Sequence, residues 1–106
     1  MGIVTGTVTY KGDPLPTGDV LFVPEAEELP YARARIAEDG TFRMSTDEFG
    51  DRVPVGSYRV MITALKDLGP ENGMLGLIPP RYNSTEKSGL QAEVIEGENT
   101  LDFALK

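Results

Sequence analysis

The feature that most constrains this chain is an alternation of residue types close to its N-terminus. From Ile3 to Tyr10, the residues Val4, Gly6 and Val8 alternate with three threonines. A period of two places successive side chains on opposite faces of an extended chain, so this segment predicts a β-strand with one buried face. A single strand cannot bury that face alone, and the remaining sequence has to supply strands that pair with it.

Six further segments have strand-like composition, and Gly or Pro stands at nearly every break between them. Gly supplies unusual backbone angles and Pro removes a ladder donor, so both residues favour turns. The predicted strands are 3–10, 19–24, 31–37, 41–45, 54–62, 90–95 and 100–105. No segment has convincing helical periodicity. Seven short strands predict an all-β fold, a seven-stranded Greek-key β-sandwich, and 106 residues are enough for a single domain spanning 1–106.

The segments 31–37 and 41–45 flank the turn residues 38–40, which predicts a hairpin. If Ala37 faces Thr41 across the turn, Arg35 lies opposite Arg43 on the outward face. Like charges that face each other across a strand pair are destabilising unless another group neutralises them. This cationic stripe is therefore the most informative polar feature of an otherwise acidic chain.

Four arginines form the candidate binding surface: Arg33, Arg35, Arg43 and Arg59. The functional hypothesis is that they bind an anionic partner or a carboxylated glycan through forked guanidinium contacts. The competing interpretation is that acids on neighbouring strands, such as Glu93 and Asp102, neutralise them. Charged sheet faces are usually only solvated, which favours the second interpretation.

Composition excludes several classes of function. The net charge of -7 argues against binding nucleic acid, whose protein partners usually present surplus Lys and Arg. The chain has no Cys and no His, so it lacks thiolate nucleophiles, Ser-His triads and the usual zinc ligands. Nothing in the spacing of Asp and Glu brings two carboxylates together as in a glycosidase. We therefore predict a non-catalytic protein without a cofactor or metal.

A long connection runs from about residue 64 to residue 89 and contains Pro70, Pro79 and Pro80. Its length predicts either a functional segment or a short helical turn. Its apolar residues are Leu65, Leu68, Met74, Leu75, Leu77 and Ile78. They either contact a partner or a second copy, or fold back over a sheet edge or one end of the core. We favour the second alternative, and expect a monomer or a weak homodimer.

Two acidic clusters, at 25–28 and 47–51, have a composition that could ligate calcium. Neither has the spacing of a known calcium loop, and solvated loop charge is the commoner interpretation. The segment 83–85 matches a glycosylation acceptor, which we interpret as turn chemistry.

Several motifs, taken in order, resemble one known family. They are Gly6-Thr7-Val8-Thr9-Tyr10-Lys11-Gly12 with 14–16 and 20–24, then Asp39-Gly40-Thr41-Phe42, then 54–60. Their order and spacing resemble carboxypeptidase-regulatory-like domains with the prealbumin (transthyretin) topology. The segments 78–82, 88–90, 96–99 and 101–103 are similar to a subset of these domains in small bacterial envelope proteins, often lipoproteins. The resemblance covers nearly the whole chain.

The resemblance implies an extracytoplasmic protein, in the periplasm or at the cell surface, held at a membrane only by an N-terminal lipid anchor that precedes Ile3. Transthyretin-like hydroxyisourate hydrolases need histidines and a C-terminal Tyr-Arg-Gly-Ser, whereas this chain has no His and ends in 103–106 as Phe-Ala-Leu-Lys. The similar collagen-adhesin domains need a reactive Lys on the first strand, and 3–10 has none. The hypothesis is a binding or scaffolding module for envelope glycan or protein. The alternative is a structural spacer that self-associates without a ligand.

Overall fold

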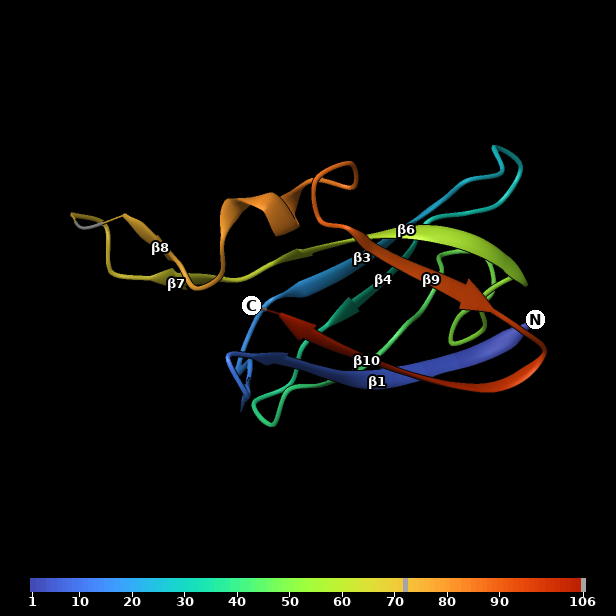
Figure 1. The fold of residues 1–106 in the computed structure, drawn as a ribbon, viewed down its shortest axis with the longest axis horizontal. Helices are drawn as coiled ribbons and strands as arrows, with labels where there is room; N and C mark the ends of the chain where they lie inside the picture. Colours follow the sequence, from blue (N-terminus) through green and yellow to red (C-terminus); the bar gives the residue numbers. More distant parts are fainter. Residues whose placement is uncertain (72, 106) are drawn as a thin grey trace.

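The computed structural model describes residues 1–71 and 73–105, with the backbone alone for Lys66, Asp67, Met74 and Leu75. Two four-stranded sheets form an all-β sandwich, as predicted (Figure 1). Sheet A contains β1 (Gly2–Tyr10), β2 (Asp13–Pro14), β5 (Thr41–Arg43) and β10 (Gly97–Leu105). Sheet B has the order β4 (Ala32–Arg35), β3 (Asp19–Pro24), β6 (Gly56–Thr63) and β9 (Leu90–Val94).

Strand β1 lies in the middle of sheet A. One of its edges pairs in parallel with β10 along its whole length, from Gly2 opposite Gly97 to Tyr10 opposite Leu105. Three segments cover the other edge in turn: Val53 by an isolated bridge, then β5, then β2. The alternation that predicted this strand therefore reflects a strand that is paired on both sides and buried on one face.

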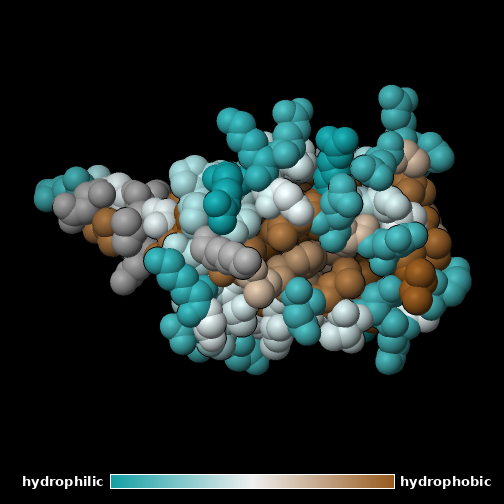
Figure 2. All heavy atoms as spheres, viewed as in Figure 1, coloured by the Kyte–Doolittle hydropathy of each residue, from teal (hydrophilic) through white to brown (hydrophobic). Residues whose placement is uncertain are grey.

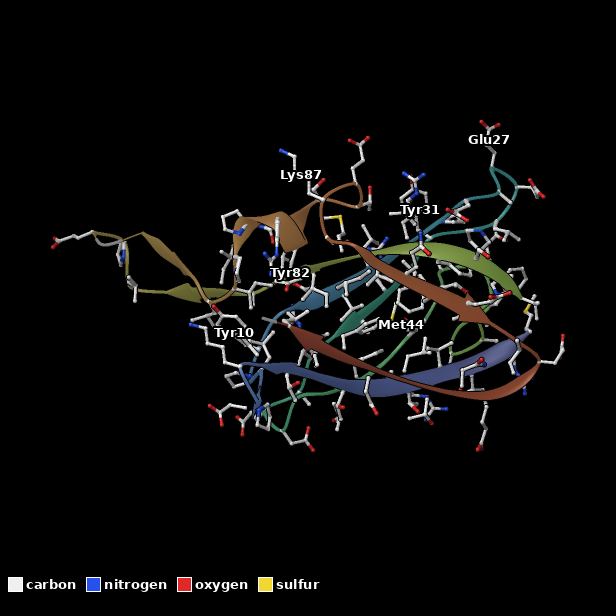
Figure 3. The ribbon with its side chains drawn as sticks, in the orientation of Figure 1. Tyr10, Glu27, Tyr31, Met44, Tyr82 and Lys87 are labelled. Atoms are coloured by element: carbon white, nitrogen blue, oxygen red, sulfur yellow. The ribbon has the colours of Figure 1, made fainter. Side chains whose placement is uncertain are left out.

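The core lies between the sheets, and aromatic rings connect its two layers. The ring centroid of Phe22 in sheet B lies 5.7 Å from that of Tyr58 and 6.5 Å from that of Phe103 in sheet A. Phe103 also stacks on Phe42 at 5.9 Å. Met44 is fully buried between the sheets (Figure 3). Burying each of these large side chains stabilises the fold by about 1.5–3 kcal/mol.

Each of the seven predicted strands is present, and three short strands accompany them in the described residues: β2, β7 (Leu65–Asp67) and β8 (Met74–Gly76). The last strand is longer than predicted. It begins at Gly97 rather than Thr100. The buried side chain of Asn99 bonds both the N–H and the carbonyl of Ile95, so the turn between β9 and β10 is short and the strand starts directly after it.

The predicted hairpin of 31–37 and 41–45 is only partly correct. The turn is present, because the Ala37 N–H donates to the Thr41 carbonyl at 2.8 Å, and Arg33 pairs with Ser45 in the register that was predicted. Between those two contacts the chains separate, since β4 pairs with β3 in sheet B and β5 pairs with β1 in sheet A. Arg35 and Arg43 therefore do not face each other across one ladder.

The connection from residue 64 to residue 89 divides into two parts. The antiparallel pair β7–β8 extends away from the sandwich (Figure 1), with Leu65 and Leu68 exposed. The second part contains the predicted short helical turn, the 3-10 helix η1 (Pro80–Asn83), and returns to the core through buried Ile78 and Tyr82. The side chains of Met74 and Leu75 lie outside those described. No helix among the described residues is long and apolar enough to cross a membrane.

Tyr58 is the largest fully buried side chain, and its hydroxyl is satisfied locally. It donates to the carbonyl of Pro54 at 2.7 Å, four residues earlier, as in the tyrosine corner of Greek-key sandwiches. Burial raises the pKa of the Tyr58 phenol above its usual value. The folded state thus favours the neutral phenol, so this stabilisation is complete below pH ~10 and is lost as the pH rises further.

We predict that Tyr58→Phe lowers the free energy of unfolding by about 1–3 kcal/mol at pH 7, because the buried Pro54 carbonyl loses its donor. The same variant should lose less stability than wild type between pH 9 and pH 11. Urea unfolding followed by circular dichroism at both pH values measures the two effects. An equal alkaline loss in both proteins would contradict the role given to Tyr58.

Candidate functional site

The outer face of sheet B gathers residues from three strands in register. Leu21 of β3 lies between Arg33 of β4 and Met61 of β6, and Asp19 lies between Arg35 and Thr63 one row along. Because side chains alternate along a strand, all of these residues point away from the core. The face therefore has a half-buried apolar centre and a cationic border on β4.

A shallow, open hollow of about 670 Å³ lies on this face. Its lining residues are Asp19, Val20, Leu21, Tyr31, Arg33, Ala34, Arg35, Met61 and Thr63. Tyr31 precedes β4 and is 55% exposed, and Figure 3 shows it on the side of sheet B that faces away from sheet A. An open hollow with an accessible ring and two guanidinium groups suits an extended polymer better than a small molecule that must be enclosed.

Arg33 and Arg35 are held only loosely by acids. Arg33 Nη2 lies 3.8 Å from Asp47 Oδ2, and Arg35 Nε lies 3.9 Å from Asp19 Oδ1. The Arg35 side chain is 88% exposed. Pairs of this length and exposure contribute between nothing and about 1 kcal/mol, so both guanidinium groups remain available to a stronger anionic acceptor.

The other two candidate arginines lie apart from this hollow. Arg43 Nη2 bonds Asp51 Oδ2 at 2.8 Å, and it lines a second hollow of about 520 Å³ on the outer face of sheet A. Arg35 reaches the rim of both hollows. Arg59, on β6, lies 3.5 Å from Glu25 and lines neither. The structure thus brings Arg33 and Arg35 to the first hollow and Arg35 and Arg43 to the second, and it places Arg59 at neither.

One acid that approaches an arginine, Asp19, lies on the neighbouring strand as the second interpretation expected, and the others lie in loops. Asp47 and Asp51 belong to the cluster that was considered for calcium, and each faces an arginine instead. Among the side chains that the structure describes, which exclude that of Asp67, no group of three or more acids is arranged to hold a metal ion.

Asp102, which was expected to neutralise an arginine, accepts hydrogen bonds from Thr7 instead. The Thr7 hydroxyl lies 2.8 Å from Asp102 Oδ1, and the Thr7 N–H lies 3.2 Å from it. A local bond of the same kind shapes the turn before β5, where the Thr41 hydroxyl and N–H donate to Asp39 two residues earlier and lower the pKa of that carboxyl. Asp102 thus bonds across the β1–β10 ladder, whereas Asp39 bonds within its own turn.

Comparison with known proteins relates this fold to few others. No family model and no curated protein matches the sequence. Among solved structures, a DUF3823 family protein from Parabacteroides merdae superposes with a TM-score of 0.53 at 16% identity, over 99% of this chain and 45% of that one. A 9R-lipoxygenase from Cyanothece gives a TM-score of 0.44 at 12% identity, over 96% of this chain and 15% of that one.

The first of these likenesses shows the fold alone, because the identity is only 16%. The second is too low to carry an argument. This chain spans less than half the length of the Parabacteroides merdae protein, so an equivalent sandwich forms one part of a larger molecule there.

Sequence reasoning found the cationic part of the hollow and missed its apolar part. Tyr31 has the same strand parity as Arg33 and Arg35, so its place on the outer face could have been inferred. Leu21 and Met61 alternate with residues that were predicted to point inward. Their meeting depends on β3 lying between β4 and β6, which no local pattern indicates.

We predict that Arg35→Ala changes the free energy of unfolding by less than about 0.5 kcal/mol, because its pair with Asp19 is long and exposed. Chemical denaturation of wild type, Arg35→Ala and Asp19→Ala measures this. A loss above about 1 kcal/mol in the arginine variant would show that Arg35 is needed for the fold rather than available for binding.

Proposed function

We propose that this chain is a non-catalytic, extracytoplasmic binding domain that recognises a carboxylated glycan of the cell envelope on the outer face of sheet B. The observation that carries the proposal is the juxtaposition of Tyr31, Arg33 and Arg35 around one open hollow. Guanidinium groups form paired hydrogen bonds with carboxylates. An exposed tyrosine ring offers a flat apolar surface and a polar hydroxyl to a sugar.

The half-buried floor of the hollow supports the same ligand class. Leu21 and Met61 provide apolar area for the ring faces of a sugar, while Thr63 and Asp19 provide hydrogen-bonding groups beside it. The net charge of -7 repels an anionic polymer while it is still distant from the protein. Once the polymer reaches the hollow, the two arginines attract its carboxylates. We therefore expect weak binding that is governed by local contacts and weakened by salt.

We further propose that the domain is of the carboxypeptidase-regulatory-like kind with transthyretin topology, and that the full protein is lipid-anchored outside the cytoplasm. The motifs from Gly6 to Tyr58 support the family, and the sandwich with parallel β1 and β10 is consistent with it. The bacterial DUF3823 likeness agrees with a domain that forms part of a larger protein.

One observation favours a second candidate, the structural spacer. Each of the four candidate arginines already has a carboxylate within 3.9 Å, as expected of a face that is neutralised internally. The protruding β7–β8 hairpin with exposed Leu65 and Leu68 would then mediate self-association. A spacer of this kind would show no response to any glycan.

We predict that oligogalacturonate, a uronic acid polymer, binds wild type and that a neutral glucan of equal length does not. Heteronuclear NMR titration should shift the amide signals of β3, β4 and β6. The variant Arg33→Gln/Arg35→Gln should weaken binding about tenfold or more, because each lost charged hydrogen bond contributes about 1.5–3 kcal/mol.

The matched control is Arg43→Gln/Arg52→Gln, which removes the same charge away from the hollow and should bind like wild type. Tyr31→Ala should also weaken binding, whereas Tyr31→Phe should retain most of it. Equal weakening by both arginine pairs would mean unspecific charge attraction. The absence of binding by wild type would favour the spacer.

A further inference from the structure

Strand β10 ends sheet A, and no strand among residues 1–71 and 73–105 pairs with its outer edge. It spans Gly97–Leu105, and it pairs with β1 on one side only. In Figure 1, β10 runs along the lower part of the sandwich, and β9 of the other sheet lies above it. Proteins usually shorten, twist or cover such an edge, because its free N–H and C=O groups can pair with another chain.

Hydrogen bonds around β1 show which peptide groups of β10 face outward. Gly2, Val4 and Val8 bond to segments on the β5 side, so the odd-numbered residues of β1 face β10. The Leu105 carbonyl accepts the N–H of Lys11, which follows β1, so the odd-numbered residues of β10 face β1. Because peptide groups alternate along a strand, the outward groups belong to the even positions. These positions are Glu98, Thr100, Asp102 and Ala104.

The two faces beside this edge differ in character. On the core side, Leu101 of β10 is only partly buried, and so is Leu90 of β9 in the other sheet. Figure 2 shows apolar surface there, between β9 and β10. On the outer side, Glu98 and Asp102 carry negative charge and are exposed. An added strand would therefore meet apolar surface on one face and acidic side chains on the other.

We propose that the outer edge of β10 binds an extended segment of a partner polypeptide, in which apolar and basic residues alternate, as an additional strand of sheet A. The main chain of the segment pairs with the peptide groups of the four even positions. Its apolar side chains cover Leu101 and Leu90, and its Lys or Arg side chains meet Glu98 and Asp102. This surface lies on the other sheet from the glycan hollow, so the proposal does not depend on the proposed function.

A second copy of this chain is a poorer occupant of the same edge. In antiparallel self-pairing, one register places Asp102 opposite Asp102, and another places it opposite Glu98. The register that pairs all four positions places Thr100 opposite Asp102 but leaves Glu98 diagonal to Asp102 of the other copy. Like charges at these positions are destabilising, and each copy carries a net charge of -7. Charge complementarity therefore favours a basic partner.

Two synthetic peptides of equal composition test the pattern. The first is Thr-Lys-Val-Lys-Val-Lys-Val-Lys-Thr, and the second groups its four lysines before its three valines. At ten times the dissociation constant of the first peptide, NMR hydrogen exchange of the full chain should slow about tenfold at the amides of Glu98, Thr100, Asp102 and Ala104. The amides of Leu101 and Phe103 already bond to β1 and should change little.

Matched variants separate edge pairing from general charge attraction. Glu98→Lys should weaken binding of the first peptide. Glu27→Lys, at the tip of the β3–β4 loop (Figure 3), should leave that binding unchanged. Ala104→Pro removes one outward N–H without removing a bond to β1, and should also weaken binding.

Equal binding of both peptides, or protection without the alternating pattern, would overturn the proposal. A stable dimer in sedimentation without peptide, in which the amides of the four even positions are already protected from exchange, would also overturn it, because a second copy would then hold the edge. Failure of the oligogalacturonate experiment leaves this result untouched, since the glycan signals arise from sheet B.

Discussion

The parallel pairing of β1 with β10 is the contact on which the rest of the structure depends. It joins the two ends of the chain along nine consecutive residue pairs. The two strands approach closely at Gly6: a Cβ added there would overlap the Leu101 carbonyl and lie 2.9 Å from the Phe42 ring. The absence of a side chain at Gly6 thus lets β10 approach β1 while Phe42 of β5 packs beneath the strand.

This central strand explains how one chain segment contributes to both sheets. With β10 on one edge, β1 has its other edge free for Val53, β5 and β2. The chain that leaves β4 in sheet B must therefore cross to sheet A within a short turn. The crossing places Arg35 and Arg43 in different sheets, and it leaves Arg35 at the rim of both hollows, one of which it shares with Arg43. The candidate site is a consequence of where the sandwich changes sheet.

Local sequence patterns predicted the elements well and their partners poorly. Alternation and turn residues located seven strands, and the inward residues Val20, Phe22 and Tyr58 are buried as predicted. The Ala37–Thr41 turn was also found, because its register depends on residues close in sequence. Strand neighbours are different: nothing within 31–45 indicates that β4 pairs with β3 and β5 with β1. That choice is made by packing between distant residues, which also decided that Leu21 and Met61 meet beside Arg33.

The stability of Gly6→Ala tests the central pairing most directly, with Gly76→Ala as its control. Gly76 has ordinary backbone angles, and the nearest atom to an added Cβ there is 3.9 Å away. Urea unfolding should show that Gly6→Ala loses about 3 kcal/mol or more, or the cooperative transition altogether, because the Leu101 carbonyl has to move and open the ladder. Gly76→Ala should stay within about 0.5 kcal/mol of wild type. Equal stability of the two variants would contradict the close pairing of β1 and β10.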